Sequence, residues 1–198
     1  MVMQMEARGQ EAREGAEERR TAAEYLAGAE SRGSELIDGK LYGMGAPDLM
    51  HAQMVLLIGE QLRACVKEDS RRGLVLPVPV GVGFREDAYT LLLPDITVTV
   101  EPGGYTSYGL MTSPDLIVEV LTEETAEKDR YIKLARYMRG GVREYWIVDP
   151  RSSTVMVYER GAAVIPMTYT FDDAVPVGIW NREACVDFRA VREAFSMK

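Results

Sequence analysis

Two acidic residues in apolar surroundings are the positions in this sequence best suited to chemistry. Asp95 follows a proline in the segment TLLLPDITVTV, and Glu119 stands between two valines in DLIVEVLT. Burying a carboxylate without compensation costs several kcal/mol, so each acid requires a cation, a hydrogen-bond network or a position at an edge. If the two strands are neighbours, both acids can bind one hard cation. Mg²⁺ suits such a site because it takes one or two carboxylates together with water and phosphate oxygens.

The same two residues also have a simpler interpretation. An acid at the solvent-facing position of a half-exposed strand, paired with a lysine or an arginine, is common in sheets with one wet face. From the spacing alone, both interpretations stay open.

Composition excludes several other kinds of site. His51 is the only histidine, which rules out a zinc site built on several imidazoles, and Cys65 and Cys185 are too far apart in the sequence for a metal knuckle. Chemistry therefore depends on carboxylates, lysines and hydroxyls. No apolar stretch approaches the ~20 residues of a membrane helix, and the charged N-terminus carries no secretion signal. We expect a cytoplasmic protein without membrane contact.

Charge is distributed unevenly along the chain. The net charge of −8 argues against nucleic-acid binding by the whole surface, because attraction to phosphates drives such binding. Residues 128–143 are nevertheless basic, with Asp129 as the only acid. We expect this stretch to form a phosphate-binding face. Its basic residues are Lys128, Arg130, Lys133, Arg136, Arg139 and Arg143.

Local signals predict alternating helices and strands. Thr21 and Glu24 are spaced as a capping box for a short helix, and Asp38-Gly39 between two β-prone segments predicts a hairpin. Longer helices are predicted over 47–67 and over 123–139, where two glycines end the pattern, and a last helix near 188–195. Strands are predicted at 74–84, which its prolines make irregular or an edge strand, and at 90–100, 115–122, 142–150 and 153–161.

This order of elements predicts one α/β domain with a mixed sheet over residues 21–198. Residues 1–20 are polar and rich in Glu, Arg and Ala, which predicts a flexible tail or a frayed helix.

Several longer segments together resemble a known family. Over roughly residues 20 to 160 the sequence resembles the Uma-two family of bacterial proteins, which have the PD-(D/E)XK nuclease fold. The resemblance implies a restriction-endonuclease-like mixed central sheet flanked by helices, with the N-terminal hairpin as an extension. The segments that carry the resemblance are ELIDGKLY, LLLPDITV, SPDLIVEVLT, KDRYIKLARYMRGGVREYWIVDP and VMVYE.

The resemblance also implies a set of site residues. Asp95 and Glu119 would bind Mg²⁺ or Mn²⁺, and the backbone carbonyl of Val120 would be a third ligand. In such nucleases the metal activates water for attack on a phosphodiester, and a nearby lysine assists by neutralising the phosphate.

The catalytic lysine is where this sequence departs from the simplest form of the motif. Leu121 occupies its usual position, and the nearest substitute is Lys133, within the pattern Asp129-x-x-x-Lys133-x-x-x-Tyr137. A long flexible side chain can bring its ammonium to the same point from a helix. The alternative is a solvated pair of Asp129 with Lys133, four residues apart on the helix surface.

Helical periodicity favours that alternative, because it turns Lys133 away from the core. The core stripe that it predicts consists of Tyr131, Leu134, Ala135 and Met138.

Five further residues are supporting candidates for the site: Asp129 and Tyr137 from the pattern around Lys133, and Glu35, His51 and Lys40. Glu35 and His51 match positions of the family pattern, and Lys40 stands where relatives commonly carry a second acid. A hairpin acid is more often structural, and a histidine at a helix start is more often a cap or a packed side chain.

These observations, with the family pattern, lead to a Mg²⁺-dependent endonuclease that hydrolyses phosphodiester bonds of nucleic acid, DNA rather than RNA. Asp95 and Glu119 would be its metal ligands, and Lys133 would be its catalytic charge stabiliser. Two alternatives stay open: a nuclease-fold binding or assembly module without activity, and a nuclease acting on RNA or on a nucleotide-sized substrate. We expect a homodimer, because cleavage of a duplex requires two active sites and two-fold dimers are the commonest assembly.

Overall fold

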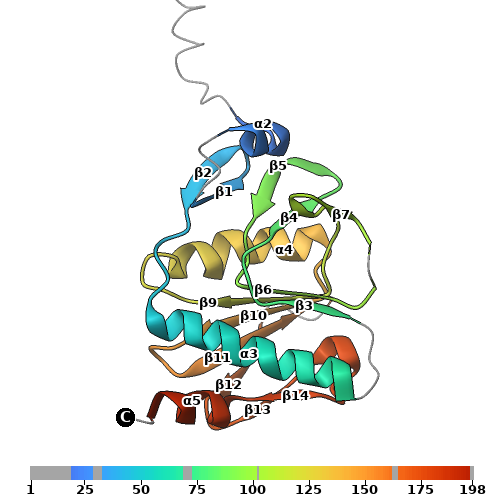
Figure 1. Ribbon diagram of the computed structural model, residues 1–198. Helices are drawn as coiled ribbons and strands as arrows, with labels where there is room; N and C mark the ends of the chain where they lie inside the picture. Colours follow the sequence, from blue (N-terminus) through green and yellow to red (C-terminus); the bar gives the residue numbers. More distant parts are fainter. Residues whose placement is uncertain (1–18, 29–32, 69–72, 102, 162–164, 197–198) are drawn as a thin grey trace, which may run out of the picture.

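Two six-stranded sheets, with helices packed on them, dominate the computed structural model (Figure 1). The structure describes residues 19–28, 33–68, 73–101, 103–161 and 165–196. Most of the predicted tail, residues 1–20, therefore lies outside the described residues. Among the helices of the described ranges, none is long and apolar enough to cross a membrane.

The first sheet, here called the central sheet, has the strand order β12-β11-β10-β9-β6-β3. It is mixed, because β9 and β10 are parallel and the other neighbours are antiparallel. In chain order its strands are β3 (Leu74–Leu76), β6 (Ile96–Thr99), β9 (Leu116–Val120), β10 (Glu144–Asp149), β11 (Thr154–Glu159) and β12 (Met167–Thr170).

Helices cover both faces of the central sheet, and Figure 1 shows α3 and α4 on opposite sides of it. Along β9 the side chains alternate: Val118 and Val120 join the core cluster under α3, whereas Ile117 joins the cluster under α4. Glu119 is two residues after Ile117, so its side chain lies on the same face of the strand and points to the α4 side. The helices are α2 (Ala22–Ala27), α3 (Leu49–Glu68), the π-helical η2 (Lys128–Lys133), α4 (Leu134–Gly140), the short 3₁₀ segment η3 (Gly178–Trp180) and α5 (Phe188–Ser196).

The second sheet, here called the N-terminal sheet, has the order β2-β1-β5-β4-β8-β7. The predicted hairpin at Asp38-Gly39 is confirmed, since both residues have positive φ, 54° and 83°, as a two-residue turn of this kind requires. It pairs through β1 with β5, so it belongs to a full sheet. The strands are β1 (Ser34–Ile37), β2 (Lys40–Gly43), β4 (Gly81–Phe84), β5 (Asp87–Leu92), β7 (Tyr105–Thr106) and β8 (Gly109–Leu110).

A small two-stranded sheet of β13 (Ala174–Pro176) and β14 (Cys185–Asp187) completes the fold beside α3 and α5. The predicted helices over 21–28, 47–67 and 188–195 are confirmed, and Thr21 and Glu24 form the predicted capping box.

The prediction of one continuous strand over residues 90–100 is wrong. This stretch forms β5 in the N-terminal sheet and β6 in the central sheet, and Leu93, Pro94 and Asp95 connect them. Pro94 has no N–H for a sheet ladder, so pairing is interrupted there. The proline-containing segment 74–84 is divided in the same way, into β3 at the edge of the central sheet and β4 inside the N-terminal sheet. Asp95 therefore lies where the chain passes from one sheet to the other.

The core stripe predicted for the second long helix is wrong at two of its four positions. Leu134 and Met138 pack against the core as predicted, but Tyr131 and Ala135 do not. Tyr131 is 68% exposed and Ala135 is exposed, whereas Lys133 is only 3% exposed and Tyr137 is fully buried. The cause is the π-helical segment η2, in which backbone hydrogen bonds join residues five apart. Its wider turn shifts the helix phase, so Lys128 and Lys133 both face inward.

Candidate active site

Glu119 is held on the α4 side of the central sheet by two donors. Its Oε1 accepts a hydrogen bond from the Tyr137 hydroxyl at 2.9 Å and lies 2.5 Å from Lys133 Nζ. Glu119 is 3% exposed, and Tyr137 comes from α4, one turn after Lys133. The predicted carboxylate on β9 is thus buried against the very helix that carries the predicted lysine.

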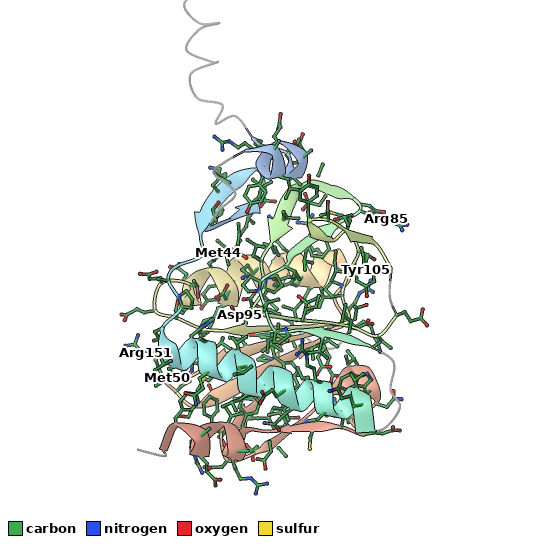
Figure 2. The ribbon with its side chains drawn as sticks, viewed as in Figure 1. Met44, Met50, Arg85, Asp95, Tyr105 and Arg151 are labelled. Atoms are coloured by element: carbon green, nitrogen blue, oxygen red, sulfur yellow. The ribbon has the colours of Figure 1, made fainter. Side chains whose placement is uncertain are left out.

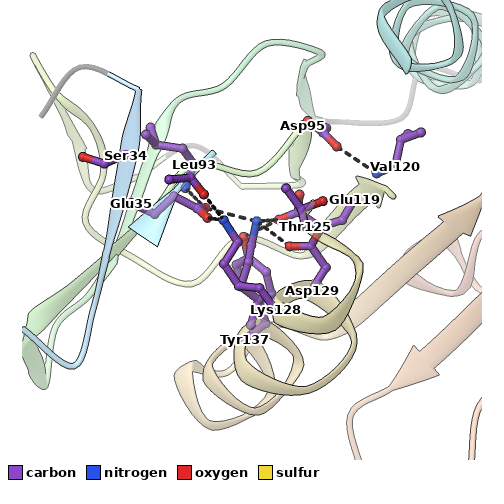
Figure 3. A network of polar contacts seen from close by, with 12 residues as sticks. Ser34, Glu35, Leu93, Asp95, Glu119, Val120, Thr125, Lys128, Asp129 and Tyr137 are labelled. Carbon is purple, nitrogen blue, oxygen red and sulfur yellow. Dashed lines mark hydrogen bonds and ion pairs between the residues drawn. The ribbon is translucent and has the colours of Figure 1, made fainter. Parts of the chain in front are cut away.

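Asp95 reaches the same place from the connection between the two sheets. Its Oδ2 accepts a hydrogen bond from the backbone N–H of Val120 at 2.8 Å (Figure 3). The same oxygen lies 3.1 Å from His51 Nε2. Val120 follows Glu119 at the end of β9, so the two acids are brought together. In Figure 2, Asp95 lies between α3 and α4.

His51 is positioned by the first turn of α3. Its backbone N–H donates to Asp48 Oδ1 at 2.7 Å, which caps the helix start, and its ring faces Asp95. The other ring nitrogen, Nδ1, is buried and has no hydrogen-bond partner among the described residues. Asp95 is therefore oriented from two sides, by a histidine and by a strand end.

Lys133 is surrounded by carboxylates. Besides Glu119, its Nζ lies 3.0 Å from Glu35 Oε1 and 3.1 Å from Asp129 Oδ1. Asp129 is 2% exposed, so the pair is not the solvated surface contact that the spacing also allowed. The structure thus places Lys133 at the centre of the site.

Glu35 connects the N-terminal sheet to this cluster. It is 1% exposed on β1, and its Oε1 accepts a hydrogen bond from the Leu93 N–H at 2.8 Å. Its Oε2 lies 2.7 Å from Lys128 Nζ, which also donates to the Gly43 carbonyl at 2.8 Å. Glu35 therefore contacts both inward-facing lysines of η2, and Figure 3 shows it beside Lys128.

The balance of charge in this cluster is negative. With every group ionised, the carboxylates exceed the lysines by two, and His51 offsets one of these charges only when it is protonated. The groups are Glu35, Asp95, Glu119, Asp129, Lys128 and Lys133.

The pKa values follow from burial and from this excess. Burial raises the pKa of Glu119 well above its usual value, and although Lys133 opposes this, Asp129, Asp95 and Glu35 add to it. Burial alone would lower the pKa of Lys133, but the surrounding acids, Glu119 foremost, raise it well above its usual value. Lys133 therefore stays protonated, and Glu119 takes up a proton more readily than an ordinary glutamate.

The donor set fits a divalent cation. One oxygen of each of Asp95 and Glu119 has no protein partner among the described residues, and the excess charge suits a doubly charged ion. Within the described ranges, no three side chains of Asp, Glu, His or Cys form a ready-made metal cage. Asp95, Glu119 and the Val120 carbonyl are the groups that would hold the cation.

These groups open into one pocket of about 250 Å³. Its polar lining includes the four acids, both lysines and His51; Val120 also lines it, and the remaining lining is largely apolar. Among the supporting candidates, Glu35, His51 and Asp129 line the pocket, and Tyr137 contacts Glu119 from behind. Lys40 is exposed on the hairpin and does not line it.

The expected basic face over residues 128–143 is not present in the form predicted. Lys128 is buried in the cluster just described, Arg130 pairs with Asp149 at 2.6 Å, and Arg136 pairs with Asp38. The acids that neutralise the arginines come from distant parts of the sequence, so local composition could not reveal them. Of the six basic residues of this stretch, Arg139 and Arg143 are exposed, and Arg143 pairs with Asp115 at 2.8 Å. Among the residues expected to contact nucleic acid, which are Lys128, Arg130, Arg136 and Arg139, only Arg139 is exposed.

The sequence matches the model of the Uma2 family, described as "Putative restriction endonuclease", over residues 22–178. The chain belongs to the Uma2 family. This membership confirms the resemblance found in the sequence and supports a restriction-endonuclease-like nuclease. Restriction-endonuclease-like proteins generally use a divalent metal.

Comparison with solved structures confirms the fold of this Uma2 member. The chain is similar to a protein from Anabaena variabilis ATCC 29413, described as "a putative nuclease belonging to DUF820", with a TM-score of 0.73 and 20% sequence identity. The similarity covers 88% of this chain and 98% of that chain, which shows a shared α/β fold. No curated protein shows a significant match to the chain.

Sequence reasoning missed the role of Lys128 and the apolar part of the pocket in this Uma2 protein. Lys128 was expected at a phosphate face, because nothing in the sequence signals a π-helical turn. The apolar lining comes from connections at 44–47 and 77–79 and from the start of α3, which are distant in sequence and individually ordinary.

Proposed function

We propose that this protein is a Mg²⁺-dependent nuclease that hydrolyses phosphodiester bonds in DNA. The observation that supports it is the convergence of Asp95, Glu119 and Lys133 in one pocket, from a sheet connection, a strand end and a π-helical turn. These are the residue types that hydrolysis of a phosphodiester requires: carboxylates for a cation and a fixed positive charge for the phosphate.

Each residue has a defined task in this proposal. A divalent cation bound by Asp95 and Glu119 would supply Lewis-acid polarisation of the phosphate and an activated water. Lys133 remains charged and lies within 2.5 Å of Glu119, so it can neutralise a phosphate at the same point. Tyr137 fixes the orientation of Glu119, and His51 that of Asp95.

One observation favours a second candidate, a nuclease-fold binding or assembly module without activity. Lys133 Nζ already has three carboxylate partners, which leaves it less free to contact a substrate. In the nuclease, a cation held by Asp95 and Glu119 would compete with Lys133 for Glu119 and so leave the Lys133 ammonium freer to contact a phosphate. The two candidates therefore differ in whether the acids bind metal.

Calorimetric titration with Mg²⁺ and Mn²⁺ tests the proposal, using wild type, Asp95→Asn and Glu119→Gln. Glu123→Gln is a matched control, because that side chain is 83% exposed and pairs only loosely with Arg151 at 3.5 Å. We expect wild type and the control to bind metal and to cut DNA, and both site variants to lose binding and cleavage. Absence of metal binding by the wild type would overturn the nuclease and leave the binding module.

A further inference from the structure

The apolar part of the pocket has no task in the proposed chemistry. It is formed by three segments that surround the opening: the connection before α3, the first turns of α3 and the connection between β3 and β4. A site that only positioned a phosphate, a cation and water would need no such surface. The apolar residues of these segments include Pro47, Ala52, Val55, Pro77, Val78 and Pro79.

This apolar wall is rigid and open to a ligand. Pro77 packs so closely on α3 that a Cβ at Gly59 would come within 2.5 Å of the proline ring. The fixed φ angles of three prolines further restrict the two connections. Val78 is nevertheless 52% exposed, and Ala52 is exposed as well. An exposed apolar surface beside a charged cluster suits a ligand with an apolar part next to an anionic one.

Charge argues against a duplex as that ligand. Binding of a duplex draws its strength from several phosphate contacts along the backbone. In this chain the net charge is −8, and Arg130, Arg136 and Arg143 are paired with acids. Within the described part of the chain, these three arginines are therefore less available to follow a duplex backbone. A single nucleotide has one phosphate to bind and a flat, largely apolar base to pack.

We infer that the apolar wall is a nucleobase subsite, so that the nucleotide beside the scissile phosphate enters the pocket unpaired, from a single-stranded segment or an extruded position. This inference rests on the proposed nuclease function and specifies its substrate class. The base packs against Ala52, Val55 and the proline connections while its phosphate reaches Lys133 and the acids. Unpaired bases are recognised in this way because every base has a face that stacks on apolar or aromatic groups, and unpairing a duplex costs free energy.

Binding of two fluorescein-labelled probes, measured by anisotropy in Ca²⁺, tests the inference. One probe is a short single-stranded DNA, and the other has the same sequence in a blunt duplex. The key variant is Ala52→Trp, which fills the opening from an exposed helical position. Leu56→Trp is the matched control, one turn further along α3, 53% exposed and outside the pocket lining.

We expect the wild type to bind the single strand about tenfold more tightly than the duplex, a difference of about 1.4 kcal/mol. Ala52→Trp should weaken single-strand binding by about tenfold or more, as expected for loss of a stacked base, and Leu56→Trp should leave it unchanged. Equal binding of both probes, or no effect of Ala52→Trp, overturns the subsite.

The metal titration separates this inference from the proposed function. Single-strand preference that depends on Ala52, in a protein that binds no Mg²⁺ or Mn²⁺, keeps the base subsite and overturns the nuclease. If Asp95 and Glu119 bind metal but wild type and Ala52→Trp bind the single-stranded probe with the same affinity, the nuclease proposal stands and the base subsite is overturned.

Discussion

Replacing Lys133 by methionine tests whether the charged cluster exists as described. The substitution keeps an unbranched side chain of similar length. It removes the ammonium group that contacts all three of Glu119, Asp129 and Glu35. Glu35 keeps Lys128 at 2.7 Å, so the charges left uncompensated are those of Glu119 and Asp129. Removing one member of a buried ion pair costs about 3–5 kcal/mol, and we expect a loss in this range at neutral pH.

Urea denaturation at several pH values measures this loss. Acidification should reduce it, because the uncompensated carboxylates take up protons and no longer carry charge. The double variant Lys133→Met/Glu119→Gln should be less destabilised than Lys133→Met alone, since it removes a cation and an anion together. Lys67→Met, at an exposed position in the last turn of α3, is the control and should change stability by less than about 0.5 kcal/mol.

Two results would refute the reasoning. A cost for Lys133→Met below about 1 kcal/mol would mean that the lysine is solvated, as for an exposed ion pair. If Lys133→Met lowered the free energy of unfolding equally at acidic and neutral pH, the loss would not come from ionised carboxylates that Lys133 compensates.

Three further predictions concern single residues. The pKa of Glu119 is higher in the folded protein than in the unfolded chain, so the protonated carboxyl favours folding. This contribution to the free energy of unfolding is fully present below the unfolded-state pKa and is lost as pH rises through the folded-state pKa. In thermal melts at several pH values, Glu119→Gln should lose less stability than wild type as the pH rises. Tyr137→Phe should cost about 1 kcal/mol in urea denaturation and weaken metal binding, because Glu119 loses a donor; unchanged affinity would exclude an orienting role. Gly59→Ala should destabilise by about 1–3 kcal/mol despite its better helix propensity, since Pro77 occupies the space; a stabilised variant would contradict the close packing.

The sequence predicted the positions that local chemistry marks. Asp95 and Glu119 were recognisable because carboxylates are rare in apolar segments, and the hairpin at Asp38-Gly39 because its turn requires positive φ. Their meeting in space could not be read from spacing. It depends on the chain crossing between sheets at Pro94, which looked like the middle of a single strand.

The errors in the second helix have a different cause. Periodicity assumes a regular α-helix, and under that assumption Tyr131 is inside and Lys133 outside. The observed order is the reverse, because a tertiary cluster of carboxylates stabilises the inward lysines and a π-helical turn delivers them. Local propensity contains no information about acids contributed by β1 and β9.

The π-helical turn also bears on how relatives of this chain should be compared. Relative to a regular α-helix, such a turn amounts to one additional residue within the helix. Each residue of an α-helix advances by about 100°, so deleting one residue from 128–133 would rotate Lys128 away from Lys133. An alignment that forbids gaps inside helices would then match Lys133 with a neighbour that faces another direction in any relative lacking the turn. In such an alignment the lysine would be absent from its column, although the relative can still place an ammonium at the same point of the site.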